Sequence, residues 1–361
     1  MLIIGCDFHT RYQQIAMMDN GDGTRTGEII ERRLEHASGE ADAFYRGLPG
    51  KTIVGIEATG PIQWFQRLLA ELGHELWVGD AAQIRACAVR KQKTDSRDAQ
   101  LILDLLLTHR FPRIWIPSVE ECDLRQLLRH RHKLVCMRTS VFNQLHAMAM
   151  GQGLCRKKKL FTAKGRQELQ SLSLGPWASR RREELLRILD QLNPSIDELD
   201  EAVEKEAKKR EDAVRLMTHP GIGPITALAF VLTIGPVARF LRSPQIARYL
   251  GLNPREHSSG GKQRMGAISK QGNKMVRWLL VEAAQNAAQG RKNAGFDPEL
   301  RRDYQRLKFR RGHAVAKVAM ARKLAVRMYW MLRSGSDYAQ LVRYARQLAG
   351  HPGGSTNPSL A

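Results

Sequence analysis

Four acidic side chains occupy positions from which they could act together on a phosphate ester. Asp7 and Glu57 each end a short apolar run, and Asp95 and Asp98, three residues apart, open a helical pattern and share one face of it. Clustered acids repel unless cations lie between them. Two Mg²⁺ or Mn²⁺ ions about 4 Å apart stabilise the attacking and leaving oxygens of a phosphodiester displacement. The alternatives are a hydrogen-bonded turn at Asp7 and helix capping by Asp95 or Asp98.

A glycine-rich segment, 251–273, is the second stretch that could do chemistry, because it has little apolar surface to bury. Ser258 and Ser259 precede two glycines, so a hydroxyl there is exposed enough to attack a phosphate. The cations that could neutralise this phosphate are Arg255, Lys262, Arg264 and Lys270. Composition alone favours a phosphate-binding loop over a nucleophile.

A turn containing Gly221 and Gly223 separates the end of one helical pattern from the start of an apolar one. Glycine permits positive φ and close backbone approach, and the amides of a new helix can hold a phosphate. The pattern resembles a helix–hairpin–helix, which binds nucleic-acid backbones without sequence preference. The alternative is a plain connection between two helices. Further cations expected to contact nucleic acid are Lys157, Lys158, Arg310 and Arg311.

The charge of the chain points to a polyanionic partner. The 361 residues carry a formal net charge of +22, and nucleic acid is the usual partner of such a surface, with an anionic membrane as the rival. No apolar run approaches the roughly 18 residues of a membrane-spanning helix, and no secretory signal is recognisable. The five cysteines are scattered and form no CxxC pair, which favours reduced thiols in the cytoplasm.

The elements that must position the four acids begin with a sheet. Apolar and β-branched runs predict strands at 2–9, 12–18, 27–34, 51–57 and 75–78, and helical periodicity predicts helices at 39–46, 61–72, 81–89 and 99–109. A meander followed by strands that alternate with helices indicates a mixed sheet with helices packed on it. The expected fold class is therefore α/β for this part, joined to an α part.

The rest of the chain is predicted to be helical. The expected helices are 120–150, 180–192, 195–216, 275–289, 298–309 and 313–332. Asn193-Pro194 is expected to separate the helix at 180–192 from the helix at 195–216. An approximate apolar seam over 180–216 indicates a helical hairpin or coiled-coil arm, acting either as a dimer contact or as a spacer. The tail after Gly350 is expected to be disordered.

The order Asp7, Glu57, Asp95, Asp98 resembles the DEDD tetrad of RuvC-like nuclease domains with an RNase H fold. The segments Lys93–Ala99 and Gly55–Gly60 resemble the N-terminal domain of the DEDD transposases of the IS110 insertion-sequence family. The Ser-Ser-Gly-Gly-Lys…Lys-x-Gly-Asn pattern that begins at Ser258 resembles the C-terminal domain of the same family, and the resemblance extends from Leu2 to about Leu332.

This resemblance implies a transposase, or site-specific recombinase, guided by an element-encoded bridge RNA that pairs with donor and target DNA. It implies that Asp7, Glu57, Asp95 and Asp98 hold Mg²⁺ or Mn²⁺ as two ions, and that Ser259, or else Ser258, forms a covalent phosphoserine. The acids of one protomer would act with the serine of another, which implies a dimer or tetramer. The expected location is the bacterial cytoplasm, associated with the nucleoid when bound to DNA.

The implied organisation is a catalytic domain, a helical linker, a transposase domain with the helix–hairpin–helix and serine loop, and a C-terminal helix with a tail. Their ranges are 1–112, 113–215, 216–335 and 336–361. Two other functions are compatible with the same residues. One is a RuvC-like Holliday-junction endonuclease that uses water and only binds phosphate at its serine loop, and the other is a nucleic-acid binder with a degenerate site.

Overall fold

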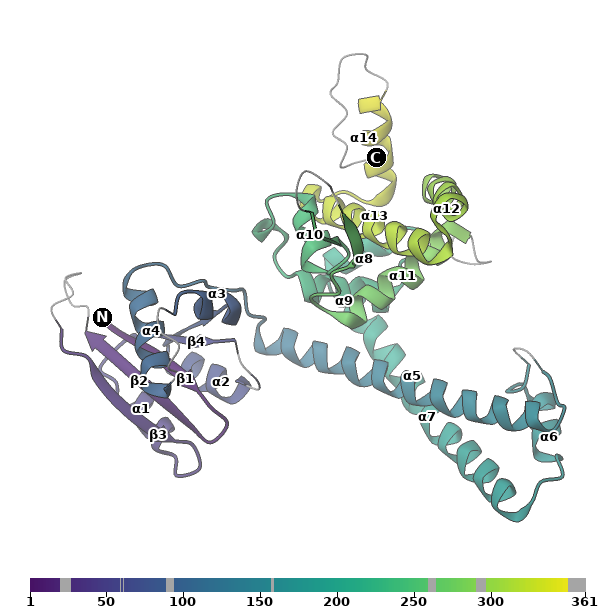
Figure 1. Ribbon diagram of the computed structural model, residues 1–361, viewed down its shortest axis with the longest axis horizontal. Coiled ribbons are helices and arrows are strands. Elements are labelled where there is room, and N and C mark those ends of the chain that lie inside the picture. Colours follow the sequence, from purple (N-terminus) through teal and green to yellow (C-terminus); the bar gives the residue numbers. More distant parts are fainter. Residues whose placement is uncertain are drawn as a thin grey trace. The chain divides into compact units, whose positions relative to one another are not determined.

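The structure is a computed structural model that describes residues 1–19, 27–58, 60, 62–88, 94–156, 159–258, 264–289 and 297–349. The chain divides into two compact units, Met1–Glu120 and Glu121–Ala361 (Figure 1). The predicted tail after Gly350 lies outside the described residues. Within the described ranges, no helix combines the length and the apolar character that crossing a membrane requires.

The first unit contains a five-stranded sheet in the order β3-β2-β1-β4-β5. Its strands are β1 (Leu2–Phe8), β2 (Tyr12–Asp19), β3 (Ile30–Glu35), β4 (Ile53–Glu57) and β5 (Glu75–Gly79). The pairs β1–β2 and β2–β3 are antiparallel, whereas β1–β4 and β4–β5 are parallel. The predicted meander followed by alternating strands and helices is therefore confirmed, and the sheet is mixed.

Helices cover both faces of this sheet. They are α1 (Glu40–Arg46), α2 (Gln63–Glu71), α3 (Ala81–Ala86) and α4 (Asp95–Leu107). Successive strand residues point to opposite faces, so Ile4 and Cys6 of β1 pack with α1 and α2, whereas Ile3 packs with α3 and α4. Position 7 of β1 therefore faces α4.

Two glycines let α4 lie directly on the two central strands. A Cβ atom at Gly5 of β1 would lie 2.9 Å from the Cα of Leu103, and a Cβ atom at Gly55 of β4 would lie 2.7 Å from a methyl group of Leu106. Side chains at these positions would lift the helix from the sheet. Each glycine stands two residues before one of the predicted strand-end acids, on the same face.

Helix α4 begins one turn before the predicted start at 99. Thr94 caps it, because its hydroxyl oxygen accepts a hydrogen bond of 3.4 Å from the amide of Arg97. Asp95 and Asp98 therefore both lie in the first helical turn, where acidic side chains also favour the helix dipole.

The second unit begins with a helical arm formed by α5 (Val119–Gly151), α6 (Ala163–Gln170) and α7 (Pro176–Lys208). One end of α5 and one end of α7 join the core of the unit through Leu124, Leu128, Val203 and Ala207. Their other ends pack on each other and on α6. The guanidinium of Arg131 on α5 binds the carboxylate of Asp200 on α7 at 2.6 Å, which clamps the hairpin.

The predicted break at Pro194 is wrong, because α7 runs through it. An internal proline removes one helical hydrogen bond and costs about 3 kcal/mol. Leu192 and Ile196 are buried on either side of it, and Arg138 of α5 donates a hydrogen bond of 3.5 Å to the side chain of Asn193. Packing along the hairpin therefore offsets the free-energy cost of Pro194, and the helix continues where the local sequence predicts a break.

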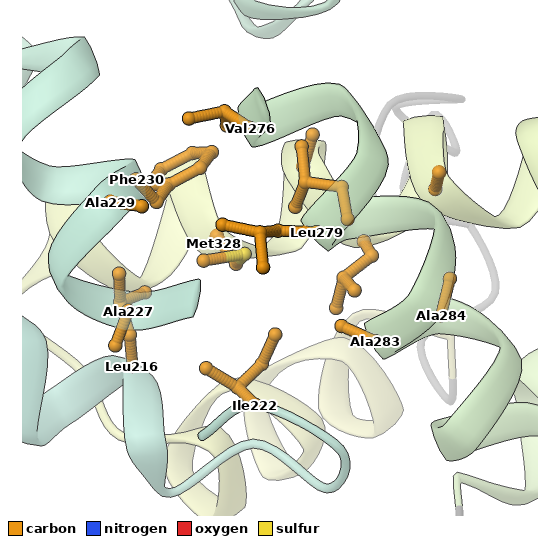
Figure 2. Close-up of a cluster of buried hydrophobic side chains, with 14 of the residues drawn as sticks. Leu216, Ile222, Ala227, Ala229, Phe230, Val276, Leu279, Ala283, Ala284 and Met328 are labelled. Carbon is orange, nitrogen blue, oxygen red and sulfur yellow. The ribbon is translucent and has the colours of Figure 1, made fainter. Parts of the chain in front are cut away.

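In the described part of the remainder of this unit, seven helices and a short 3-10 turn, η1 (Val237–Arg239), make up most of the chain. The helices are α8 (Glu211–Met217), α9 (Pro224–Ile234), α10 (Ser243–Tyr249), α11 (Lys274–Gln289), α12 (Pro298–Arg311), α13 (His313–Ser334) and α14 (Tyr338–Ala349). Figure 2 shows how Phe230 of α9, Leu279 of α11 and Met328 of α13 meet in its core. A two-stranded antiparallel ribbon of β6 (Pro254–Glu256) and β7 (Met265–Ile268) completes it.

A buried polar group ties four of these helices together. Asp297, which caps α12, binds the guanidinium of Arg327 on α13 and accepts a hydrogen bond of 2.9 Å from the hydroxyl of Tyr338 on α14. The Nε2 atom of His219, which follows α8, lies 3.7 Å from the Asp297 carboxylate. Burial, with the nearby positive charge of Arg327, lowers the pKa of His219 to about 4.

Candidate metal centre and serine loop

The first two acids of the predicted site lie at the ends of adjacent parallel strands. Cys6 of β1 pairs with Ile56 of β4, so Asp7 and Glu57 follow in the same register at the same edge of the sheet. Both side chains are on the face that α4 covers, because Gly5 and Gly55 two residues earlier contact that helix. The repeated order of glycine, apolar residue and acid thus places two carboxylates on one edge.

The first turn of α4 brings the other two acids to Asp7. Burial raises the pKa of Asp7, and the negative charges of Asp98 and Asp95 raise it further, while the nearby His9 acts in the opposite direction. Only 8% of Asp7 is exposed. The protein therefore holds Asp7 where its negative charge is unfavourable.

His9 joins the acids at this edge, although the sequence patterns did not single it out. Its Nε2 atom lies 3.1 Å from Oδ2 of Asp7 and 3.5 Å from Oδ2 of Asp95. The three side chains offer ligand atoms that all lie within 4.8 Å of one another. The available signal was spacing, since a residue two positions after Asp7 tends to return to the same face of the strand.

Tyr12 holds Asp95 in place from the neighbouring strand. The Tyr12 hydroxyl on β2 donates a hydrogen bond of 2.8 Å to Oδ2 of Asp95. The guanidinium of Arg33 on β3 lies 3.6 Å from the centre of the Tyr12 ring, and the centre of the His9 ring lies 4.7 Å from it. Tyr12 thus orients a carboxylate that His9 also approaches, a second contact that the sequence patterns missed.

Glu57 has a different partner from the other acids. Its carboxylate lies 3.8 Å from the guanidinium of Arg85 on α3, and the side chain is 25% exposed. The described residues thus bring Asp7, Asp95 and His9 into one group, with Asp98 close enough to raise the pKa of Asp7. Glu57 lies on the adjoining strand beside that group.

The donor set suits a divalent cation. Carboxylate oxygens are the ligands that Mg²⁺ and Mn²⁺ prefer, and Mn²⁺ accepts an imidazole nitrogen more readily than Mg²⁺ does. Asp7, His9 and Asp95 could hold such an ion together, with Asp98 and Glu57 beside them. A bound cation would also offset the burial and the repulsion by Asp98 and Asp95, which together raise the pKa of Asp7.

Ser258 lies at the end of the β6–β7 ribbon, an element that the sequence patterns did not predict. The backbone amide of His257 donates a hydrogen bond of 2.9 Å to the carbonyl of Arg264, closing the ribbon. The Ser258 hydroxyl donates to the Glu256 carboxylate at 2.6 Å and accepts from the Arg264 amide at 3.2 Å. Ser259 and Lys262, between these residues, lie outside the described residues.

The other predicted nucleic-acid contacts have varied surroundings. The Arg255 guanidinium donates to the Ser269 carbonyl at 3.4 Å, and Lys270 has a left-handed backbone with φ of 58°. Lys157 and Lys158 lie outside the described residues. Arg310 and Arg311 are exposed in the last turn of α12.

The predicted glycine turn joins α8 to α9. Gly221 has φ of 83°, and a Cβ atom there would lie 2.8 Å from the carbonyl oxygen of Ala283 on α11, so close packing accounts for this glycine. Gly223 is exposed at the start of α9, where an amide could meet a phosphate.

Comparisons with known proteins agree with this architecture. The chain matches the transposase family described as IS116/IS110/IS902 over residues 213–305 and the DEDD transposase family of IS110 over residues 4–151. The chain is 30% identical to a probable family 20 transposase of Pseudomonas aeruginosa, over 92% of this chain and 96% of that protein. It is 33% identical to the transposase for insertion sequence element IS1111A of Coxiella burnetii, over 69% of each chain.

A further relative, the transposase for insertion sequence element IS1328 of Yersinia enterocolitica, is 29% identical over 64% of this chain and 70% of that protein. The chain belongs to the IS110 family of DEDD transposases. The family predicted from the two motif sets is thus confirmed, and the enzyme class is a DNA transposase.

Proposed function

We propose that this transposase cuts and rejoins DNA through a covalent phosphoserine at Ser259, assisted by a divalent cation that Asp7, His9 and Asp95 hold. The observation that carries the proposal is the group of three ligand atoms within 4.8 Å of one another, in the part of the chain that matches the DEDD transposase family. Asp98 and Glu57 complete the acidic edge from α4 and β4. The cation is Mg²⁺ or Mn²⁺, and two ions would use all four acids.

The chemical step exchanges one phosphate ester for another. The Ser259 hydroxyl oxygen forms a bond to the DNA phosphorus, the bond from phosphorus to one DNA oxygen breaks, and the serine proton ends on that oxygen. A hydroxyl of a second DNA end then attacks the phosphoserine and restores the serine. The number of phosphate esters is conserved, so neither water nor a nucleotide cofactor is consumed.

A bound divalent cation would supply positive charge for the oxygens on which negative charge develops. The residues of this chain provide the framework for it. Tyr12 fixes one Asp95 oxygen by a hydrogen bond of 2.8 Å, and Gly5 lets α4 approach the strand that carries Asp7. Arg255, Arg264 and Lys270 flank the serine segment as cations for the DNA phosphate.

The choice of Ser259 over Ser258 rests on the partners of Ser258. The Ser258 hydroxyl both donates a hydrogen bond, to Glu256, and accepts one, from the Arg264 amide. The Arg264 amide thus already binds the Ser258 oxygen, the atom that would have to attack phosphorus, and this contact joins the two sides of the ribbon end. Ser258 is therefore assigned a structural role, and the adjacent serine is the nucleophile.

The proposed partners are donor DNA, target DNA and a bridge RNA that pairs with both. The net charge of +22 supports polyanionic partners, and membership of the family supports the DNA. We propose a homo-oligomer, a dimer or a tetramer, in which the acids of one protomer act with the serine of another. The arm of α5, α6 and α7 is the proposed contact between protomers.

A denaturing gel tests the nucleophile. The purified full chain, with co-purifying RNA retained and Mg²⁺ added, is incubated with labelled DNA that spans the ends of its element. A labelled band at the size of the protein is expected, and it should disappear in both Ser259→Ala and Asp95→Asn. The matched control, Ser258→Ala, should retain the band.

Three outcomes would contradict the proposal or part of it. Cleaved DNA without a protein-linked band would indicate a RuvC-like endonuclease that uses water, and Ser259→Ala should then cleave normally. A band that survives Ser259→Ala but disappears in Ser258→Ala would move the nucleophile by one residue. Loss in the acidic variant alone would leave the metal site supported and the serine assignment wrong.

A further inference from the structure

On helix α12 the acidic side chains pair with cations of α13, whereas basic side chains on the opposite, outer face are exposed. Leu300 and Tyr304 are buried, and Asp303 is buried beside them. Asp303 pairs with Lys323 of α13, and Glu299 pairs with Arg327 of the same helix. The acidic side chains of α12 are therefore neutralised where the helix meets α13.

The outer face is basic and carries one aromatic ring. Phe309 is 94% exposed, the highest fraction among the exposed large apolar side chains of the described residues. At 100° per residue, Gln305 and Arg306 lie about one turn before Phe309, and Arg302 lies about two turns before it, all on the same side of the helix. Lys308 and Arg310 flank it in sequence, and both side chains are exposed, so cations border this face on either side.

We propose that this outer face of α12 binds unpaired DNA and that Phe309 stacks on an exposed base. Single-strand binding combines cations that follow the phosphates with aromatic rings on which bases stack. A paired base keeps its faces inside the duplex, so a stacking ring discriminates in favour of a strand whose bases are free. This site goes beyond the proposed cleavage chemistry and does not depend on it.

The charges around the ring argue for nucleic acid as the occupant. Arg302, Lys308, Arg310 and Arg311 have no acidic partner within ion-pair distance among the residues that the structure describes. Arg306 has one, Asp303 at 3.6 Å, and its own side chain is 66% exposed. An acidic protein could also meet such cations, but it would offer no regularly spaced flat faces for the ring.

The experiment compares two probes by fluorescence anisotropy: a labelled single strand of about 16 nucleotides and the duplex of the same sequence. The full chain is first freed of nucleic acid by a high-salt wash. Phe309→Ala should weaken binding of the single strand about fivefold or more and change binding of the duplex less than about twofold. Phe309→Trp should restore it. The side chain is exposed, so folding should be unaffected, which circular dichroism checks.

Salt dependence separates stacking from charge. Between about 50 and 200 mM salt, Phe309→Ala should leave the slope of log Kd against log salt unchanged, because a ring releases no counterions. Arg302→Ala should weaken both probes and lower the slope by about 0.7 for the single strand. Leu241→Ala removes another exposed apolar side chain of the same unit, and it should change the affinity for neither probe.

Two results would overturn the proposal. An equal loss on the single strand and the duplex in Phe309→Ala, or no loss on either, would remove the stacking role. Tighter binding of an RNA strand than of DNA, with the same dependence on Phe309, would assign the face to RNA. Because binding is measured without cleavage, failure of the metal or serine assignments would not affect either reading.

Discussion

Gly5 on β1 lies against Ala99 on α4 so closely that a side chain at position 5 would collide with the Ala99 carbonyl group. In the sequence, the two residues are far apart: β1 begins the first unit and α4 is its last helix before α5. Their contact sets the height of α4 above the sheet. It therefore also sets the distance between the acids of the first turn of α4 and the acid of β1.

We predict that Gly5→Ala destabilises the first unit and disrupts the metal site. The added methyl group meets backbone atoms that cannot rotate away, and overpacking of this kind costs about 1–3 kcal/mol. The thermal midpoint should fall, and Mn²⁺ should no longer raise it. The control is Gly47→Ala, where φ is −82° and the added Cβ makes only ordinary contacts. Unchanged Mn²⁺ stabilisation in Gly5→Ala would contradict the positioning role.

Asp7→Asn should stabilise the metal-free protein while abolishing its response to metal. Burial raises the pKa of Asp7, so its ionised form is disfavoured in the folded state and lowers stability at pH values above that pKa. This effect on stability is opposite to that of an acid paired with a cation, whose pKa is lowered and whose ionised form stabilises the fold. In EDTA the variant should melt about 4 °C higher than the wild type. With Mg²⁺ or Mn²⁺ the wild type should gain stability and the variant should not. A lower midpoint in EDTA would refute this account.

Tyr12→Phe should weaken metal binding without loss of fold. The change removes the hydrogen bond of 2.8 Å to Asp95 but keeps the ring that contacts His9 and Arg33. Loss of a group that orients a metal ligand typically costs about tenfold or more in affinity. Mn²⁺ titration followed by electron paramagnetic resonance measures it. Tyr344→Phe, which changes an exposed tyrosine, is the control, and equal affinities in all three proteins would exclude the orienting role.

Acid should destabilise the second unit through His219. Burial lowers the pKa of His219 to about 4, from 6.5 for an ordinary histidine, so between these values the unfolded chain binds a proton that the folded chain does not. Stability contributed by the neutral folded histidine is therefore lost as the pH falls through this window, by at most about 1.4 kcal/mol per pH unit.

Urea unfolding at several pH values measures this loss. The slope of stability against pH should be shallower in His219→Asn than in the wild type, between pH 6.5 and about 4. His130→Asn, which replaces an exposed histidine of α5, should keep the wild-type slope. Identical slopes in both variants would mean that His219 does not carry the effect.

Sequence patterns predicted the sheet and its four acids because both depend on local order. An apolar run that ends in a carboxylate marks a strand end, and two acids three apart mark a helical face, so Asp7, Glu57, Asp95 and Asp98 could be proposed from the sequence as one site. For His9 the only local signal was its spacing after Asp7, and for Tyr12 there was none. Their approach to Asp95 depends on the turn that joins β1 to β2 and on how α4 lies on the sheet.

The errors have the same origin. Pro194 disfavours a helix locally, but α7 continues through it because contacts with α5 favour the helix. The β6–β7 ribbon was missed because its strands have three and four residues, too short for an alternating pattern to be recognised. In each case a contact between distant residues decides what the local sequence leaves open.

The two long helices of the arm, α5 and α7, fix the distance from one end of the arm to the other. Each has 33 residues, which corresponds to about 50 Å at the usual helical rise. Arg131 with Asp200, Arg138 with Asn193 and Arg181 with Gln144 fix the register of one helix against the other. A slip by one turn would break all three pairs at once. The spacing between α6 and the core of the unit is therefore set by residue number, and only insertions or deletions in both helices together could change it.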